Sequence, residues 1–243
     1  MTRRDAAIDR VLELATRYWE NNGDYLRQAA DVGRSWEDYP QCQVSDPITR
    51  GELLLEAKNL DRKDMRGFFV RVMAWGHGPS GYAAYRVNRI LQVLDAVADS
   101  GSVRLINWIS QLRAEAKGGP EKAFEFLGSD VGCIKYLGPS FSTKVLYFLS
   151  PEGNRAPILD AVVNSWLWRQ GVASRAAPIE LDHQDHAGYS QWVQFCDDAL
   201  AHLKGRSRKQ FPDDRGFIEY LVFQDQSRYV ANLGLASWIR ASD

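Results

Sequence analysis

The stretch 137-LGPSFSTKVLYFL-149 places a single lysine, Lys144, where a short polar segment passes into an apolar run. With the residues before it, this stretch predicts a helix over 129–137, a turn over 138–142 and a second helix over 143–149. Such a helix–hairpin–helix directs backbone N–H groups and the positive end of the second helix towards a DNA phosphate. The pattern therefore favours an all-α protein that contacts DNA through this hairpin.

Lys144 is expected in the first turn of the second helix, which is an unfavourable place for an ammonium group. The aligned peptide dipoles put partial positive charge at a helix N-terminus. The same field disfavours the charged form of the amine, so the position favours a neutral and nucleophilic Lys144. The alternative is a lysine that binds phosphate or is simply solvated.

Asp160 follows sixteen residues later, in the stretch 156-APILDAVVNSWL-167, at the start of another predicted helix. A carboxylate there can cap free backbone N–H groups, which is a purely structural role. It can also face Lys144, because two consecutive helix N-termini can converge on one point. We therefore expect Lys144 and Asp160, the latter in a catalytic segment 157–170, to line one groove wide enough for an extruded nucleotide.

The composition fits an ordinary globular chain. The 243 residues are 45% hydrophobic, which suits one domain over 1–243, or two small lobes that share a cleft. Lys and Arg total 30 against 31 Asp and Glu, so DNA binding requires basic groups gathered on one face. Three scattered cysteines exclude a four-ligand iron–sulfur cluster and do not favour a metal site. We expect a cytoplasmic protein with no membrane contact, because no signal peptide or apolar span is evident.

Apolar residues recur at helical spacing along most of the chain, and two-residue alternation is scarce. This periodicity predicts nine or ten helices in an all-α domain, with a short strand near 41–45. The stretches with the clearest helical spacing are 6–19, 61–75, 83–97, 102–114, 159–168, 189–203 and 215–224.

GPSFSTKVLYFL (138–149) followed by APILDAVVNSW (156–166) resembles the active-site segment of helix–hairpin–helix DNA glycosylases, above all the 8-oxoguanine DNA glycosylases and their prokaryotic relatives. The family hairpin reads Pro-Gly-Val-Gly-Thr-Lys, and a Pro-Val-Asp segment follows it. The residues that match are Pro139, Thr143, Lys144, Pro157 and Asp160, with one extra residue between the last two.

Three positions depart from the family pattern. Ser140 and Ser142 replace the two hairpin glycines, and their hydroxyls, with Thr143, are the expected DNA contacts. Phe148 lies one helical turn beyond Lys144, on the face expected to line the base pocket. Its bulk argues against 8-oxoguanine as the substrate and leaves the sugar chemistry unaffected.

The resemblance implies a two-lobed all-α fold and cleavage of the N-glycosidic bond of a modified base. Such cleavage builds positive charge on the sugar, which the Asp160 carboxylate can stabilise. A neutral Lys144 can attack C1′ and form a Schiff base, which permits later strand cleavage as an AP lyase. The family also implies double-stranded DNA with a flipped nucleotide as partner, a monomer, and no cofactor apart from a monovalent cation at the hairpin. Its biological settings are base-excision repair and phage defence against hypermodified DNA.

A glycosylase also needs a wedge for the DNA stack and walls for the base pocket. The loop 75–82 offers His77 or Tyr82 as the wedge, with Arg86 on the next helix as a phosphate contact, or it is an ordinary helix–helix turn. The pocket walls are assigned to Tyr189 and Trp192, although aromatics at helical spacing are more often core.

Two further hypotheses stay open. One is a helix–hairpin–helix module that binds DNA without cutting it, and the other is a helical scaffold with an accidental resemblance. The pairing of Lys144 with Asp160 favours the enzyme, because a mere binder has no need of a carboxylate near a phosphate.

Overall fold

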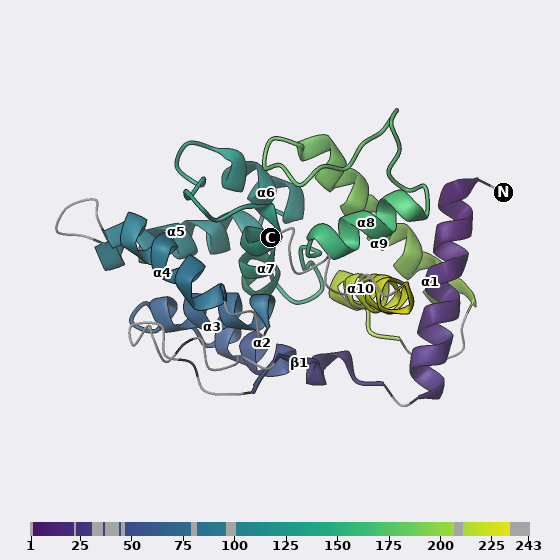
Figure 1. The fold of residues 1–243 in the computed structure, drawn as a ribbon, viewed down its shortest axis with the longest axis horizontal. Coiled ribbons are helices and arrows are strands. Elements are labelled where there is room, and N and C mark those ends of the chain that lie inside the picture. The colour runs from purple at the N-terminus through teal and green to yellow at the C-terminus, as the bar shows by residue number, and fades with distance from the viewer. Residues whose placement is uncertain are drawn as a thin grey trace.

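The structure, a computed structural model, describes residues 2–21, 23–30, 36, 44, 47–78, 82–95, 101–206 and 211–233 (Figure 1). These residues form ten α-helices, one 3-10 turn and one two-stranded antiparallel sheet, so the fold is all-α as predicted. The elements are α1 (Arg3–Glu20), η1 (Tyr25–Arg27), β1 (Ala29–Ala30), β2 (Ile48–Thr49), α2 (Arg50–Lys58), α3 (Met65–His77), α4 (Ala83–Asp95), α5 (Gly101–Ala116), α6 (Pro120–Gly128), α7 (Pro139–Leu149), α8 (Ala161–Arg169), α9 (His186–Arg206) and α10 (Arg215–Asn232).

The seven stretches with helical spacing correspond to α1, α3, α4, α5, α8, α9 and α10. Two short helices were not predicted. In α2, Thr49 and Glu52 form a capping box, and the buried side chains Arg50, Leu53 and Ala57 do not make an all-apolar stripe. In α6, Pro120 occupies the first turn after Gly119, in a stretch that otherwise suggests a break. Apart from Val44, the strand expected near 41–45 lies outside the described residues.

The prediction of a helix over 129–137 is wrong, because this segment is a series of turns between α6 and α7. Tyr136 has φ of 72°, a left-handed conformation that no helix accommodates. The Ser129 hydroxyl donates to Phe126 O and accepts from Gly132 N–H, while the Trp108 indole donates to Gly132 O. Side chains therefore bond to backbone groups that a helix would pair internally.

The predicted turn over 138–142 is also misplaced, because α7 already begins at Pro139, with Gly138 as its N-cap. Lys144 is consequently the sixth helical residue and lies in the second turn. The helix dipole acts mainly on the first turn, so it does not explain this lysine. The reason for its position has to come from its neighbours in space.

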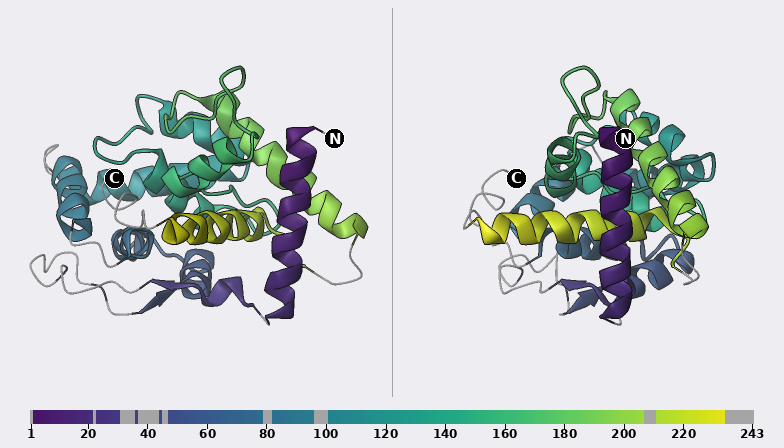
Figure 2. Two further views of the ribbon diagram at one scale, coloured as in Figure 1. Left: turned by 45° about the vertical axis from the view of Figure 1, so that its right-hand side comes forward. Right: turned by 90° about the vertical axis from the view of Figure 1, so that its right-hand side faces the viewer.

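The helices pack as two sets, which are the two lobes expected from the family. One set, which we call the C-terminal set, contains α1, α8, α9 and α10. The other set contains α2 to α7, and α6 packs on α9 between the two sets. Figure 1 shows α1 at one end of the long axis and α4 and α5 towards the other end. In the right-hand view of Figure 2, α1 runs across α10. The first helix of the chain therefore packs on the C-terminal set, against α9 and α10. Within the described residues, no helix combines the length and apolarity needed to cross a membrane.

Asp225 joins three helices of the C-terminal set. Its carboxylate accepts hydrogen bonds from Arg10 on α1 and from Trp166 and Arg169 on α8. Burial alone raises the pKa of Asp225, but these three donors outweigh it and hold that pKa below its usual value. The stabilisation is thus complete above the pKa of an unfolded aspartate, about 3.9, and is lost as the pH falls through the lower folded pKa.

We predict that Asp225→Ala lowers the free energy of unfolding by about 2–4 kcal/mol at neutral pH, because it leaves buried donors unpaired. The matched control is Asp213→Ala, which removes an exposed ion pair with Lys204 and costs less than about 1 kcal/mol. Urea titrations measure both values, and the deficit of Asp225→Ala shrinks as the pH drops into the acid range. Equal losses in the two variants would contradict the assigned role of Asp225.

Candidate active site

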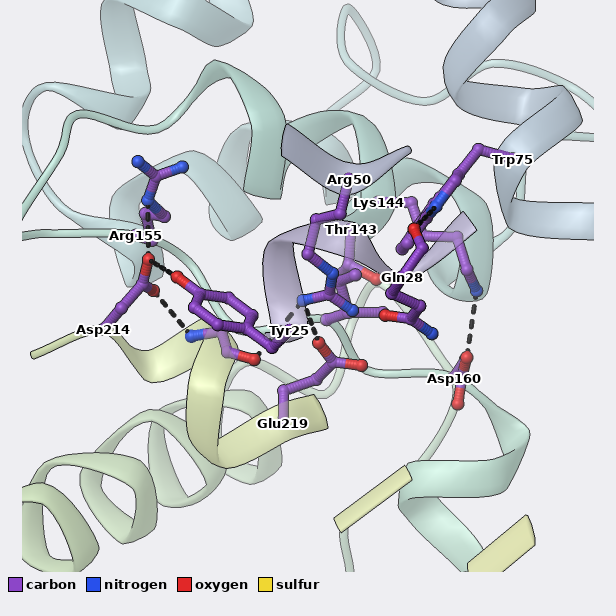
Figure 3. A network of polar contacts seen from close by, with 12 residues as sticks. Tyr25, Gln28, Arg50, Trp75, Thr143, Lys144, Arg155, Asp160, Asp214 and Glu219 are labelled. Atoms are coloured by element: carbon purple, nitrogen blue, oxygen red, sulfur yellow. Dashed lines mark hydrogen bonds and ion pairs between the residues drawn. The ribbon is translucent and has the colours of Figure 1, made fainter. Parts of the chain in front are cut away.

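The structure brings Lys144 and Asp160 together at the junction of the two helix sets (Figure 3). The Lys144 Nζ lies 3.0 Å from Asp160 Oδ2 and also donates to the Ser140 carbonyl at 3.0 Å. The other carboxylate oxygen of Asp160 accepts from Val163 N–H at 3.0 Å and caps α8. Asp160 therefore makes both of the expected contacts at once: it caps α8 and it pairs with Lys144.

The sequence predicts that the pair lines an open groove. In the structure, both side chains are instead covered by other side chains. Only 8% of the Lys144 side chain and 10% of the Asp160 side chain are exposed. The lysine stem passes Gly76, where an added Cβ would lie 2.6 Å from Lys144 Cδ, so glycine leaves the room that the lysine fills. The amine lies 5.0 Å from the centre of the Phe141 ring. A nucleotide reaches this pair only if part of the cover moves.

The extended segment that leads to Asp160 is held by side-chain hydrogen bonds at three consecutive residues. The Tyr189 hydroxyl donates to Pro157 O and the Trp192 indole donates to Ile158 O, each at 3.0 Å. The Thr143 hydroxyl accepts from Leu159 N–H at 3.2 Å and donates to Pro139 O at 2.7 Å. These bonds pair the backbone groups of a buried segment outside any helix and fix where Asp160 begins α8.

Several predicted contacts have other roles in the structure. Thr143, Tyr189 and Trp192 are fully buried, and their polar atoms bond to backbone groups of the protein. Ser142 is 1% exposed and bonds to His183 Nε2 at 2.7 Å. In this structure none of these four side chains presents a surface to DNA. Ser140 is half-buried and contributes its carbonyl to Lys144.

Phe148 is a core residue and not a wall of the Lys144 site. It is 2% exposed and packs edge-on against Trp75 and Tyr147. It also lines a cavity of about 270 Å³ near the C-terminal end of α7, and neither Lys144 nor Asp160 belongs to that lining. The bulk of Phe148 therefore gives no information about the substrate base.

His77 and Tyr82, the two wedge candidates, differ in their surroundings. His77 stacks on Phe141 with ring centres 3.9 Å apart, and its Nε2 has no hydrogen-bond partner within the described part of the chain. Burial, with the nearby charges of Arg86 and Lys144, lowers the pKa of His77 to about 3, so the ring is neutral at neutral pH. Tyr82 is 52% exposed, whereas residues 79–81 of the same loop lie outside the described residues.

The match to known proteins covers both helix sets and the pair between them. The sequence model of a family described as “Putative 8-oxoguanine DNA glycosylase OGG-like protein” matches residues 11–223. The chain belongs to this family. Searches of curated proteins and of solved structures gave no match. The matched range, residues 11–223, includes Lys144 and Asp160 and covers most of the chain.

A second buried ion pair next to Lys144 and Asp160 was missed in the sequence. Arg50 Nη1 lies 2.8 Å from Glu219 Oε2, and the two side chains are 1% and 2% exposed. Burial raises the pKa of Glu219 despite the opposing effect of Arg50, and the charges of Asp160 and Lys144 also act on it. The four charged groups thus form one electrostatic unit, with Arg50 from α2 and Glu219 from α10 (Figure 3). A glutamate inside the apolar run 217–223 was the only signal in the sequence.

Gln28 lies beside this unit and adds a polar group that has no partner among the described residues. The backbone carbonyl of Gln28 accepts a hydrogen bond from the Trp75 indole. Its side-chain oxygen is buried and has no hydrogen bond to any described residue. In the view of Figure 3 the Gln28 amide extends between the two ion pairs. A buried acceptor without a partner is uncommon in proteins and suits a ligand that donates a hydrogen bond.

We predict that Thr143→Val lowers the free energy of unfolding by about 1–3 kcal/mol, because it leaves the buried Leu159 N–H unpaired. Thr143→Ser keeps the hydroxyl and retains most of the stability. Thr16→Val serves as control, since the Thr16 hydroxyl bonds only to Leu12 O within α1. Urea titrations measure the free energy of unfolding of each variant. Equal losses in Thr143→Val and Thr16→Val would show that the Thr143 hydroxyl does not stabilise the segment before Asp160.

Proposed function

We propose that this protein is a DNA glycosylase that removes a modified base from double-stranded DNA and forms a covalent intermediate through Lys144. One observation carries the proposal: in a member of the OGG-like family, the Lys144 amine lies 3.0 Å from the Asp160 carboxylate. A nucleophile with a proton acceptor in contact is the arrangement that N-glycosidic cleavage by an amine requires.

The first steps use both groups. The Lys144 ammonium gives a proton to Asp160, and the neutral Nζ attacks C1′ of the extruded nucleotide. A C1′–N bond to lysine forms and the glycosidic bond breaks. Its electron pair and the proton held by Asp160 leave with the base. The Asp160 carboxylate, charged again, faces the positive charge that develops on the sugar.

The later steps lead to strand cleavage. The nitrogen lone pair forms a C=N bond while the C1′–O4′ bond breaks, and O4′ takes the proton released by the attacking nitrogen. The product is a Schiff base between Lys144 and the open sugar. Loss of a C2′ proton then expels the 3′ phosphate, which is the AP-lyase reaction.

The burial of the pair supports this chemistry. In a site with little water, the interaction between Asp160 and a developing positive charge is stronger than in solvent. The nucleotide must displace part of the cover, and His77 and Phe141 stack on each other immediately beside the amine. We propose that the base enters on the side of Gln28, whose buried amide oxygen can accept a hydrogen bond from a base N–H.

The excised base and the biological setting are tested together with a substrate panel. The panel contains duplexes with oxidised purines, other damaged bases and hypermodified bases, and intact phage DNA. Release of an oxidised base supports a function in base-excision repair, whereas release confined to hypermodified phage DNA supports phage defence. DNA binding with no release from any member would support the non-catalytic binding module instead.

We predict that the wild-type protein, incubated with its substrate and borohydride, forms a covalent adduct with DNA because the Schiff base is reduced. Lys144→Gln and Lys144→Ala abolish the adduct, and denaturing electrophoresis measures it. Lys63→Gln is the control, since Lys63 is an exposed lysine in the turn before α3. If the wild type releases the base without forming any adduct, Lys144 is not the nucleophile. The nucleophile is then a water molecule activated by Asp160.

We predict that Asp160→Asn folds normally and loses base release by about 10²–10⁴-fold, because asparagine caps a helix but accepts no proton. Unfolding in urea checks the fold, and single-turnover release checks the chemistry. Asp214→Asn is the matched control, because Asp214 caps α10 as Asp160 caps α8. Release at the wild-type rate in Asp160→Asn would remove Asp160 from the mechanism.

A further inference from the structure

The cavity of about 270 Å³ beside the C-terminal end of α7 is lined by four cations and one carboxylate, and we call it the basic pocket. Lys58 ends α2, Arg113 lies in the last turn of α5, Lys117 directly follows α5, and Arg155 precedes α8. Glu152 is the one acidic residue among the described residues of the lining. In a chain of formal net charge -1, the pocket thus gathers an excess of three positive charges.

Acidic neighbours along the chain do not neutralise the two lysines of the pocket. Glu56 and Glu115, each two residues before one of these lysines, form ion pairs with cations outside the pocket. Lys58 and Lys117 are exposed, and neither forms an ion pair within the described part of the chain. The positive charge of the pocket is therefore available to a ligand.

Helix dipoles account for part of this charge. The C-terminal ends of α2, α5 and α7 all lie at the pocket, and each such end is equivalent to about −0.5 elementary charge. A single cation at each end would need no further explanation. Three ends amount to about −1.5 charges, so about +1.5 charges remain after the dipoles are balanced. This remainder matches a phosphate monoester, whose charge at neutral pH is about −1.5 to −2.

The Arg155 side chain is fixed with its terminal nitrogens free to bind. Its Nε lies 2.8 Å from Asp214 Oδ2, and only 13% of the side chain is exposed. In Figure 3 the two terminal nitrogens of Arg155 point away from the Asp214 carboxylate. A guanidinium that is already ordered loses less entropy on binding, and its N–H groups match the geometry of phosphate oxygens.

The rest of the lining is largely apolar. Leu54 and Pro151 are half-buried beside the buried side chains of Ala57, Phe148 and Leu149. An inorganic ion would leave this surface in contact with water, whereas an organic phosphate would cover it, which is favourable. The volume is close to the lower limit of about 300 Å³ for pockets that hold small molecules, so the ligand is compact.

We propose that the basic pocket binds a small organic phosphate, with the phosphate held by the two lysines and Arg155 and the apolar part against Phe148. The occupant is a free small molecule and not DNA. Neither member of the candidate catalytic pair belongs to the lining, and the proposal does not depend on base removal.

Isothermal titration calorimetry in a buffer without phosphate or sulfate tests the pocket with three probes. Phenyl phosphate carries both a phosphate and an apolar ring, inorganic phosphate lacks the ring, and phenol lacks the charge. We expect phenyl phosphate to bind at least about tenfold more tightly than either fragment, because only phenyl phosphate uses both parts of the pocket. No binding of phenyl phosphate, or binding no tighter than that of a fragment, would overturn the proposal.

Variants of exposed residues locate the bound probe. The double variant Lys58→Gln/Lys117→Gln weakens the binding of phenyl phosphate about tenfold, and Glu152→Gln, which removes the carboxylate, strengthens it about threefold. The control Arg17→Gln/Arg175→Gln removes two exposed positive charges outside the pocket and leaves the affinity unchanged. Equal affinities in the lysine variant and in the control would place the probe elsewhere and contradict the assignment.

DNA phosphates are another source of the same chemistry, so the lysine variant is also titrated with a duplex that contains a tetrahydrofuran abasic analogue. We expect this variant to bind the duplex as the wild type does. A loss of DNA affinity as large as the loss for phenyl phosphate would assign the pocket to DNA and overturn the small-molecule site. A wild type that binds phenyl phosphate in the pocket but releases no base would refute the glycosylase and not the pocket.

Discussion

The ion pair between Lys144 and Asp160 is the interaction on which the candidate site depends. Two charges that are about nine-tenths buried lose most of their hydration, and their attraction compensates for this only with good geometry and further hydrogen bonds. Both are present here, because Ser140 O accepts from the amine and Val163 N–H donates to the carboxylate. Each member of the pair therefore has one further hydrogen bond, although a well-packed apolar pair often stabilises a fold as well as a buried ion pair does.

The junction between the two helix sets contains a second pair of this kind. Arg50 and Glu219 join α2 of one set to α10 of the other, as Lys144 and Asp160 join α7 to α8. Packing alone would favour apolar residues at such an interface. Two adjacent buried ion pairs, and a buried Gln28 oxygen without a described partner, instead suit a place where a polar ligand enters and charge moves.

Much of the fold was predictable because helical periodicity survives in the single sequence. The segment 129–137 was misassigned because its turns depend on hydrogen bonds from Ser129 and Trp108 and on the left-handed Tyr136, none of which alters the apolar pattern. The contact between Lys144 and Asp160 was expected from two converging helix starts and from the resemblance to the glycosylases, and the structure shows it. The helix-dipole explanation for Lys144 failed because α7 begins five residues before it.

The remaining site residues needed the tertiary structure. The helical spacing of Tyr189 and Trp192 is more typical of core residues than of a base pocket, and only the structure shows that their polar atoms bond to Pro157 O and Ile158 O. Arg50 and Glu219 are helical charges, which usually lie on the surface.

Mass spectrometry of the borohydride-reduced protein–DNA adduct tests the central claim most directly. Proteolysis and fragmentation of the adduct identify the amine that is bonded to the sugar. We predict the modification on Lys144 alone. A modification on the N-terminal amine or on another lysine, with Lys144 recovered unmodified, would contradict the role of the Lys144–Asp160 pair in sugar chemistry.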